Sequence, residues 1–229
     1  MYKQFSALLT IIAISACGGD PVVVPPKLYV GFPASIDPHC RDGKARIFDE
    51  CGDQSALFST ALARAKTDGK VLLVEFGSEW CIWCHAFEAH VNGQHHRFRY
   101  TYGAPDETEA RYTHTFVEGE GADAAAADAL RDFVAANFVI VHIDAENAPN
   151  GWAVLDSTGA REHYPGGIPF VFTVDESGRF AAMFNHDAAE VRRESEKDWY
   201  RGYNRASMTR QLTAMRDAAG AAAAPGDNK

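Results

Sequence analysis

The strongest constraint on the fold is a pair of cysteines that directly follows a continuous apolar run. Residues 71–76 read VLLVEF, and residues 80–84 read WCIWC, with two residues between Cys81 and Cys84. A short unbroken apolar run predicts a strand buried on both faces, as in a parallel sheet. The residues after Cys81 predict a helix that ends near Asn-Gly at 92–93. The cysteine pair is therefore expected where a buried strand passes into a helix.

The start of a helix is a favourable place for a reactive thiol. Backbone N–H groups of the first turn lack partners within the helix and carry a partial positive charge, so they stabilise a thiolate. Only the thiolate attacks a disulfide, through a mixed-disulfide intermediate. This position predicts Cys81 as an exposed attacking thiol. Cys84, one turn on and facing inward, is then the resolving thiol that closes the disulfide.

Strand and helix signals alternate along the rest of the chain. The predicted elements are, in order, a helix over 55–66, a strand over 71–76, a helix from the cysteine pair, a helix over 122–137, a strand over 138–144, strands over 169–175 and 179–185, and a helix over 204–218. Asp53 is a candidate N-cap for the first helix, and Asp68-Gly69 ends it. This order predicts a mixed α/β sheet covered by helices on both faces.

Four stretches, in the right order, resemble the thioredoxin superfamily. They are the strand and active-site motif at 74–84, the central strand at 141–144, the cis-proline loop at 167–170 (GIPF) and the turn between the last two strands at 175–178. The resemblance extends over about residues 56–218. Residues 83–85 (WCH) and the strand over 137–144 are most similar to a bacterial branch with a WCxWCH-type motif. It implies a thioredoxin-like fold, with a central mixed sheet flanked by helices, an N-terminal extension and an insertion after the CxxC helix.

The resemblance also implies catalytic roles. Cys81 and Cys84 correspond to the family's attacking and resolving thiols, joined as a disulfide in the oxidised protein. Glu75 corresponds to a buried acid that takes and returns the Cys84 proton; the alternative is a carboxylate at a strand end, paired with a surface cation. The lysine that accompanies this acid in thioredoxin has no match here, because its position falls at about Ile140.

Residues around the cysteine pair are expected to contact the substrate. Pro169 would present the backbone of Ile168 to an extended segment by strand-like hydrogen bonding. Ile82 and Trp83 stand where thioredoxin has Gly-Pro, and with Trp80 they form an apolar rim suited to an unfolded or peptide-like partner. These apolar residues do not by themselves fix the redox potential, so the sequence leaves the direction of electron flow open.

The amino terminus reads as an export signal. A positively charged start precedes a short apolar stretch over 5–16, which is too short to span a bilayer comfortably. Residues 14–17 (ISAC) resemble the lipobox of bacterial lipoproteins, so Cys17 is the expected lipidation site; the alternative is an ordinary secretory signal with a chance cysteine. A lipid-anchored envelope protein facing the periplasm is predicted, and Gly18 after the cysteine favours the outer membrane over the inner.

Composition suggests the domain boundaries. The predicted division is a signal over 1–17, a Pro-rich tether over 18–27, the thioredoxin-like domain over 28–217 with a polar and aromatic insertion over 94–121, and a disordered Ala/Gly-rich tail over 218–229.

The cysteine count fits an exported protein, because such a location permits disulfides. With Cys17 set aside, the remaining four cysteines divide into Cys40/Cys51 and Cys81/Cys84. The first pair encloses ten residues and is expected to be a structural disulfide, with a second redox-active pair as the alternative.

Some partner classes are disfavoured. The formal net charge of −9 and the lack of a basic run argue against nucleic acid. We expect no metal and no organic cofactor. A metal site formed by His90, His95, His96 and His114 is the alternative, although such histidines are more often solvated surface groups.

The predicted function is thiol–disulfide exchange with exported protein substrates, with a redox partner protein that resets the pair. Two alternatives stay open. Residues 81–85 also fit the CxxCH signal for c-type haem, which the lack of a Soret band in purified protein would exclude. In the other alternative the chain is a non-enzymatic binding or assembly module of the envelope, with Cys81–Cys84 as a permanent disulfide. In place of the haem signal, His85 is interpreted as a first-turn helix residue next to Cys84 that tunes the thiolates when charged or simply faces solvent.

Overall fold

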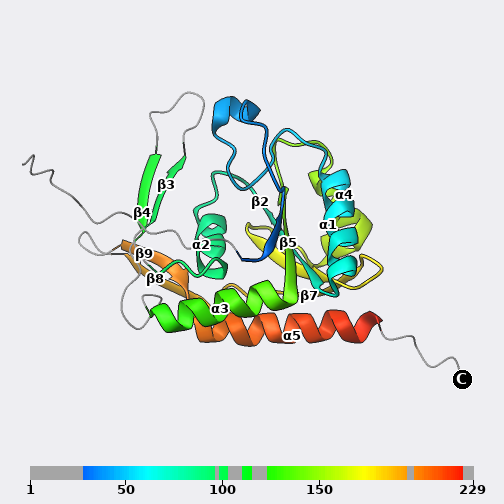
Figure 1. Ribbon diagram of the computed structural model, residues 1–229. Helices are drawn as coiled ribbons and strands as arrows, with labels where there is room; N and C mark the ends of the chain where they lie inside the picture. Colours follow the sequence, from blue (N-terminus) through cyan, green and yellow to red (C-terminus); the bar gives the residue numbers. More distant parts are fainter. Residues whose placement is uncertain (1–27, 96–97, 103–109, 115–122, 195–198, 224–229) are drawn as a thin grey trace, which may run out of the picture.

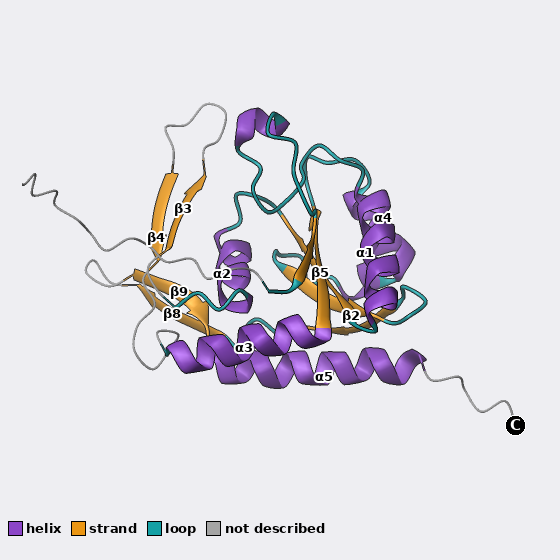
Figure 2. Ribbon diagram, viewed as in Figure 1, coloured by secondary structure: helices purple, strands orange, loops and turns teal. Residues whose placement is uncertain are grey.

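A five-stranded mixed sheet lies at the centre of the protein, with helices on both sides (Figure 1, Figure 2). The structure is a computed structural model that describes residues 28–95, 98–102, 110–114, 123–194 and 199–223. Its sheet has the order β1-β5-β2-β6-β7 and consists of β1 (Val30–Phe32), β2 (Val71–Gly77), β5 (Phe138–Asp144), β6 (Phe170–Val174) and β7 (Phe180–Met183).

Strand direction divides this sheet into two parts. β5 pairs in parallel with β1 and β2, whereas β6 is antiparallel to β2, and β7 is antiparallel to β6. Residues 71–77 of β2 face residues 138–144 of β5 in unbroken register. This order and these directions are those of the thioredoxin-like fold, so the predicted fold class is confirmed.

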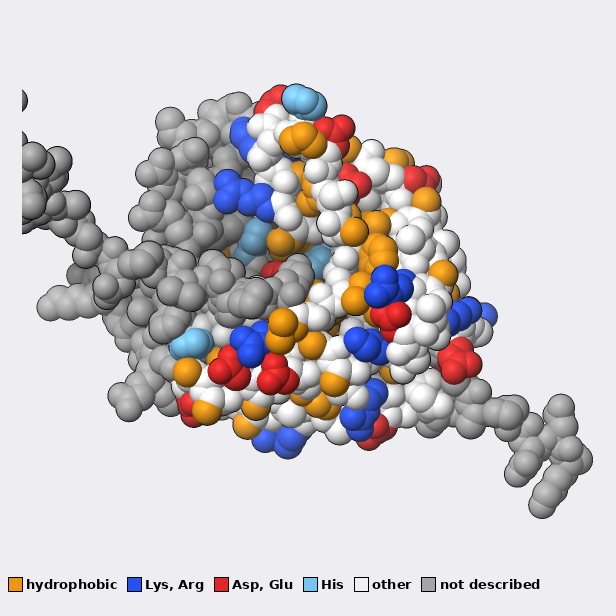
Figure 3. Space-filling model, viewed as in Figure 1, with side chains coloured by type: hydrophobic (Ala, Val, Ile, Leu, Met, Phe, Trp, Pro, Cys, Tyr) orange, Lys and Arg blue, Asp and Glu red, His pale blue; other side chains and the backbone are white. Residues whose placement is uncertain are grey.

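Helices form the outer layers of the described chain. They are α1 (Gln54–Asp68), α2 (Ile82–Val91), α3 (Ala124–Asn137), α4 (Gly151–Thr158) and α5 (Arg205–Ala223), with the 3₁₀ turns η1 (Cys40–Gly43) and η2 (Ala160–His163). α1 and α4 cover one face of the sheet, and α2, α3 and α5 cover the other. α3 and α5 lie side by side, and their outward surfaces carry side chains of both charges (Figure 1, Figure 3).

Burial on both faces explains the unbroken apolar strands. Successive side chains of a strand point to opposite faces. Ile140 of β5 packs with residues of α2, α3 and α5, whereas Val139 and Val141 pack with residues of α1 and α4. Every residue of β5 is buried, so an apolar side chain is favoured at almost every position.

The expected ends of the first helix are confirmed. The side chain of Asp53 accepts the N–H of Ala56, and Gly69 ends the helix in a left-handed conformation with φ of 63°. Glycine adopts this conformation without the steric cost of a Cβ atom.

Besides the two 3₁₀ turns, six of the described elements lie outside the sequence predictions. They are β1, α4, the hairpin of β3 (Phe98–Tyr102) with β4 (Ala110–His114), and the hairpin of β8 (Glu190–Glu194) with β9 (Trp199–Tyr203). The first hairpin falls within the predicted insertion over 94–121. The strands of the two hairpins are short and rich in polar residues, and a strand without an apolar period is recognised only by its partner.

The last helix is longer than predicted. α5 continues to Ala223, so residues 218–223 of the predicted disordered tail are helical, and Ala219 is buried. Alanine is the strongest helix former, and burial of one helical face adds to that preference. The predicted signal over 1–17 with Cys17, the tether over 18–27, and residues 224–229 lie outside the described residues. Within the described part, none of the helices combines the length and the apolarity that crossing a membrane requires.

Candidate active site

The two cysteines of the CxxC motif are joined in a disulfide at the start of α2. β2 ends at Gly77, three residues turn the chain, and Cys81 is the N-cap residue of the helix. The Sγ atom of Cys81 accepts the backbone N–H of Cys84 at 3.2 Å. This contact directs an N–H of the first helical turn at the sulfur, where it stabilises a thiolate.

Gly77 lets the end of β2 approach the disulfide closely. A Cβ atom at this position would lie 2.6 Å from the Sγ atom of Cys84 and 2.9 Å from Cζ of Phe48. Neither group has room to withdraw, because Cys84 and Phe48 have no exposed surface. The site therefore requires glycine here for space.

Both cysteines are buried, which corrects the prediction that Cys81 is exposed. Cys81 is 3% exposed, and Cys84 is fully covered. Phe48 forms one apolar cluster with them, and Ile47 and Ile168 pack against this cluster. Phe48 and Ile47 come from the loop before α1, a segment without a periodic pattern in the sequence.

Glu79 holds the loop before α1 against the motif. One carboxylate oxygen of this buried residue accepts the backbone N–H groups of Arg46, Ile47 and Phe48, at 3.0, 3.0 and 3.1 Å. Burial raises the pKa of Glu79, and the three hydrogen bonds oppose that rise. The sequence analysis missed this residue.

His85 is neutral and turned inward. Burial lowers its pKa to about 4, and Nε2 lies 2.7 Å from the carbonyl oxygen of Glu79, to which it donates. Neither predicted state of His85, a charged neighbour of the thiolates or a solvent-facing group, therefore describes it. A haem ligand would need this same nitrogen free, so the arrangement does not fit the c-type haem alternative.

A cluster of buried polar side chains lies between the sheet and α2. Glu75 of β2 and His142 of β5 are paired in register and are 0% and 2% exposed. Nε2 of His142 lies 3.3 Å from a carboxylate oxygen of Glu75 and 3.3 Å from one of Glu88 on α2. Tyr29 donates its hydroxyl hydrogen to Glu88. We call these four residues the carboxylate–histidine cluster.

The two carboxylates keep His142 charged. Burial disfavours an imidazolium, but the hydrogen bonds and charges of Glu75 and Glu88 outweigh it and raise the pKa of His142 to about 9. The position of thioredoxin's lysine falls at about Ile140, and His142 supplies the cation beside Glu75 instead. The partner comes from two residues further along the same strand, on the same face.

Phe48 connects this cluster with the disulfide. Its ring packs against Cys81 and Cys84 and also meets the ring of His142 edge-on, with centroids 5.5 Å apart. A single aromatic side chain from the loop before α1 thus contacts both parts of the site.

The loop before β6 completes the site. The peptide bond between Ile168 and Pro169 is cis, and Ile168 packs against the cysteine cluster. Next to it lies a groove of about 220 Å³, lined by Trp83, Pro165, Gly167, Ile168, Pro169, His186, Glu190 and Tyr203. The hairpin of β8 and β9 supplies two of these residues, Glu190 and Tyr203, which the sequence analysis missed.

The other predicted rim residues differ in exposure. Trp80 is 40% exposed and donates its indole N–H to Glu146 at 2.7 Å. Trp83 packs against Tyr203, with ring centroids 5.5 Å apart, and Ile82 is half-buried. The predicted rim is thus an exposed Trp80 beside a partly buried Ile82 and Trp83.

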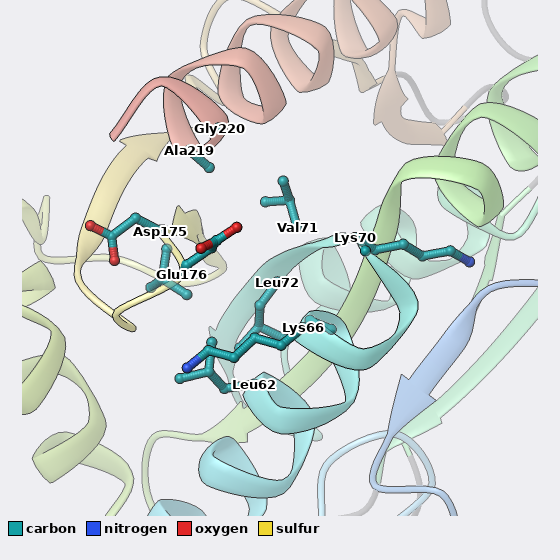
Figure 4. A pocket seen from close by; sticks show the side chains of 12 residues that line it. Leu62, Lys66, Lys70, Val71, Leu72, Asp175, Glu176, Ala219 and Gly220 are labelled. Carbon is teal, nitrogen blue, oxygen red and sulfur yellow. The ribbon is translucent and has the colours of Figure 1, made fainter. Parts of the chain in front are cut away.

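A larger cavity lies away from the cysteines, where β2 begins (Figure 4). It measures about 390 Å³, and its wall includes Lys66, Asp175 and Glu176 together with apolar side chains of α1 and α5. The cysteine motif follows the opposite end of β2, so this cavity does not belong to the site.

The second disulfide joins Cys40 and Cys51. With Asp49 they form the cluster of potential metal ligands in the described part of the chain, but the disulfide engages both sulfur atoms. His90 is buried, and its two ring nitrogens lie within hydrogen-bond distance of the Ala86 carbonyl and the Tyr203 N–H. His96 lies outside the described residues.

No protein-family model and no curated protein matches the sequence. Among solved structures, the chain is similar to a DsbH oxidoreductase, at 12% identity and a TM-score of 0.37 over 73% of this chain and 88% of that chain. It is also similar to the oxidised C-terminal domain of DsbD from Neisseria meningitidis, at 17% identity and a TM-score of 0.32 over 71% and 97%. At these values, a conclusion about activity has to come from the site itself.

Proposed function

We propose that this protein is an exported thiol–disulfide oxidoreductase that exchanges disulfides with protein substrates through Cys81 and Cys84. The observation that carries the proposal is the disulfide at the N-cap of α2, where the Sγ atom of Cys81 already accepts a helix N–H. Such contacts favour the thiolate, which is the species that attacks a disulfide.

The reaction uses both cysteines in turn. In the reducing direction, the Cys81 thiolate attacks one sulfur of a substrate disulfide and forms a mixed disulfide, and the other substrate sulfur leaves as a thiolate. Cys84 then loses its proton and attacks the Sγ atom of Cys81, which releases the second substrate thiolate. The substrate gains two electrons, and the Cys81–Cys84 disulfide forms again. A redox partner protein resets it, and oxidation of a substrate follows the same steps in reverse.

Glu75 is the proposed acceptor of the Cys84 proton. It is fully buried on the strand that leads to the motif, and His142 lies 3.3 Å from it. The imidazolium balances one of the two carboxylates of the carboxylate–histidine cluster, which leaves a net charge of one negative unit. Uptake of a proton by Glu75 therefore makes the cluster neutral.

The groove beside Pro169 is the proposed site for the substrate chain. An extended segment can hydrogen-bond to the backbone of Ile168 as an added strand would, next to the cysteine pair. Trp83 offers aromatic surface to an apolar side chain, and the Glu190 carboxylate gives the groove one acidic group. An unfolded or loop-borne disulfide with apolar neighbours fits this surface.

Export and anchoring complete the proposal. We propose that Cys17 carries the acyl chains and that the domain faces the periplasm, at the outer rather than the inner membrane. Metabolic labelling with a clickable palmitate analogue tests this. The wild-type chain is expected to take up the label and to sediment with membranes, whereas Cys17→Ser is expected to lose both properties. A label retained in Cys17→Ser would contradict acylation at this residue.

One observation favours a second candidate function. Cys81 is 3% exposed, as expected for a permanent disulfide in a non-enzymatic binding or assembly module. The two candidates differ in the stability of the bond. A structural disulfide resists reduction by glutathione, whereas a redox-active one exchanges within the range of cellular couples.

The reduction potential of Cys81–Cys84 therefore tests the proposed function. We expect equilibration with glutathione redox buffers to give a value above about −300 mV, together with catalysis of insulin reduction by dithiothreitol. The fluorescence of Trp80 and Trp83, which flank Cys81, reports the redox state. A potential far below that value, without insulin reduction, would assign the bond to the structural alternative.

A further inference from the structure

Residues 46–48, which we call the cap segment, cover the cysteine pair. Phe48 packs directly on Cys81 and Cys84, and Ile47 packs against the same cluster. All three backbone N–H groups of the cap segment are hydrogen-bonded to Glu79, two residues before Cys81. A substrate sulfur cannot reach Cys81 along the line of attack while this cover stays in place, because the residue is only 3% exposed.

The second disulfide closes the loop that carries the cap segment. Cys40 and Cys51 lie on either side of it, and Cys51 is exposed whereas Cys40 is 3% exposed. In Figure 1 this loop, with η1 in blue, lies at the end of the sheet where β2 and β5 end, as does the cysteine motif that follows β2.

The loop is anchored unequally at its two ends. After the cap segment, buried Gln54 donates to the carbonyl groups of Asp49 and Gly52 at 2.8 and 2.9 Å, and its side-chain oxygen accepts the backbone N–H of Asp144 on β5 at 2.8 Å. Before it, the backbone hydrogen bonds of residues 40–44 run to partners three residues earlier, so they are local. The bond to Cys51 is therefore the covalent link between this half of the loop and the anchored half.

The first half of the loop also holds an unfavourable backbone conformation. Arg41 and Asp42 have φ values of 51° and 57°, in the left-handed region, and Gly43 follows with 76°. L-residues other than glycine rarely adopt this region. Opening of the disulfide would let these residues return to favoured conformations, which moves the loop away from its present path.

We propose that Cys40–Cys51 is a second reducible site, and that its reduction by a dithiol reductant releases the cap segment from Cys81 and Cys84. This inference rests on the proposed exchange activity of the first pair and adds a gate to it. With Cys40–Cys51 closed, the cap segment shields Cys81. With the bond open, the exchange site is accessible.

The step balances in atoms and electrons. A thiolate of the reductant attacks the Sγ atom of exposed Cys51, and Cys40 leaves as a thiolate that takes up a proton. The second thiol of the reductant then attacks the mixed disulfide and releases Cys51, which is protonated in turn. The pair gains two electrons and two protons, and the reductant becomes a disulfide.

The test follows the two disulfides separately in the full-length oxidised chain. Dithiothreitol is added, samples are quenched with acid and alkylated, and peptide masses report each pair. In the wild type, we expect Cys40–Cys51 to be reduced first and Cys81–Cys84 to follow after a lag. In Cys40→Ser/Cys51→Ser we expect Cys81–Cys84 to be reduced about 10-fold faster and without a lag, since access limits the rate.

Two further variants separate release of the cap segment from general loosening. Phe48→Ala keeps both disulfides but removes the ring over the cysteines, so it should also accelerate reduction of Cys81–Cys84. Arg41→Ala removes only the 3.6 Å ion pair with Glu50, and its rate should match the wild type. Equal rates of Cys81–Cys84 reduction in all four proteins would overturn the proposal. Reduction of Cys81–Cys84 before Cys40–Cys51 in the wild type would also overturn it, and this order is measured without any variant.

Failure of the gate and failure of the proposed function are distinguishable. The rate of reduction by dithiothreitol is measured without a protein substrate, so it reports access alone. Insulin reduction that is absent in the wild type and in Cys40→Ser/Cys51→Ser would contradict the exchange function. Reduction of Cys81–Cys84 by dithiothreitol at equal rates in both proteins, together with insulin reduction, would contradict the gate and leave the exchange function supported.

Discussion

Replacement of Cys81 by Ser is expected to abolish insulin reduction, with a rate at least about 1000-fold below that of the wild type. Cys81 lies at the N-cap of α2, where its sulfur accepts a helix N–H, and it is the sulfur that has to form the mixed disulfide. A hydroxyl at this position has almost the same shape but does not form that bond. The turbidity assay with dithiothreitol measures the effect.

Cys84→Ser is the matched comparison for this result. It also removes one sulfur, but it leaves the attacking thiol in place. We therefore expect Cys84→Ser to accumulate a mixed disulfide between Cys81 and the insulin chain, visible on a non-reducing gel, whereas Cys81→Ser forms none. Full activity in Cys81→Ser would contradict the exchange mechanism.

His142→Gln is expected to destabilise the protein by about 3–5 kcal/mol, because it leaves two buried carboxylates without their shared cation. Glu75 is fully buried and Glu88 nearly so, and both lie 3.3 Å from Nε2 of His142. Urea denaturation at pH 6 measures the loss. His39→Gln, at an exposed histidine, serves as the control and should change the stability by less than about 0.5 kcal/mol.

The pH dependence of this effect has a definite sign. The pKa of His142 is raised from its ordinary value of 6.5 to about 9 in the folded protein. The stability that it contributes is therefore complete below pH 6.5 and is lost as the pH rises through 9. The difference between wild type and His142→Gln should accordingly shrink by about 3 kcal/mol over this window. A difference that stays constant with pH would show that His142 is not charged at neutral pH.

A double variant tests the pairing itself. In Glu75→Gln/His142→Gln the buried charge of Glu75 is removed together with its partner, so its loss of stability should be smaller than the sum of the two single losses. Additive losses would mean that Glu75 and His142 do not interact.

The sequence predicts the centre of this fold well. The strand over 138–144 is found with the predicted bounds, and the strand predicted over 71–76 extends by one residue. Unbroken apolar runs are informative because a strand covered on both faces needs apolar residues at nearly every position. The position of the cysteine pair, between such a strand and a helix, follows from the same local pattern.

The carboxylate–histidine cluster could not be predicted from local sequence patterns. His142 lies within an apolar strand, and its significance depends on the register that places it opposite Glu75. A sequence pattern indicates which residues form a strand, but the pairing of two strands depends on contacts between distant residues. His142 lies two positions after Ile140, which corresponds to the family's lysine, on the same face of β5.

The sequence by itself determined the chemistry of the motif: two thiols one helical turn apart, after a buried strand, with an acid six residues before the first. Local patterns suffice for this, because apolar periodicity and helix starts depend on neighbouring residues. Only the tertiary structure decided that Cys81 is covered. That cover comes from Phe48, more than thirty residues earlier in an irregular loop, and burial by such a segment depends on contacts that no local pattern encodes.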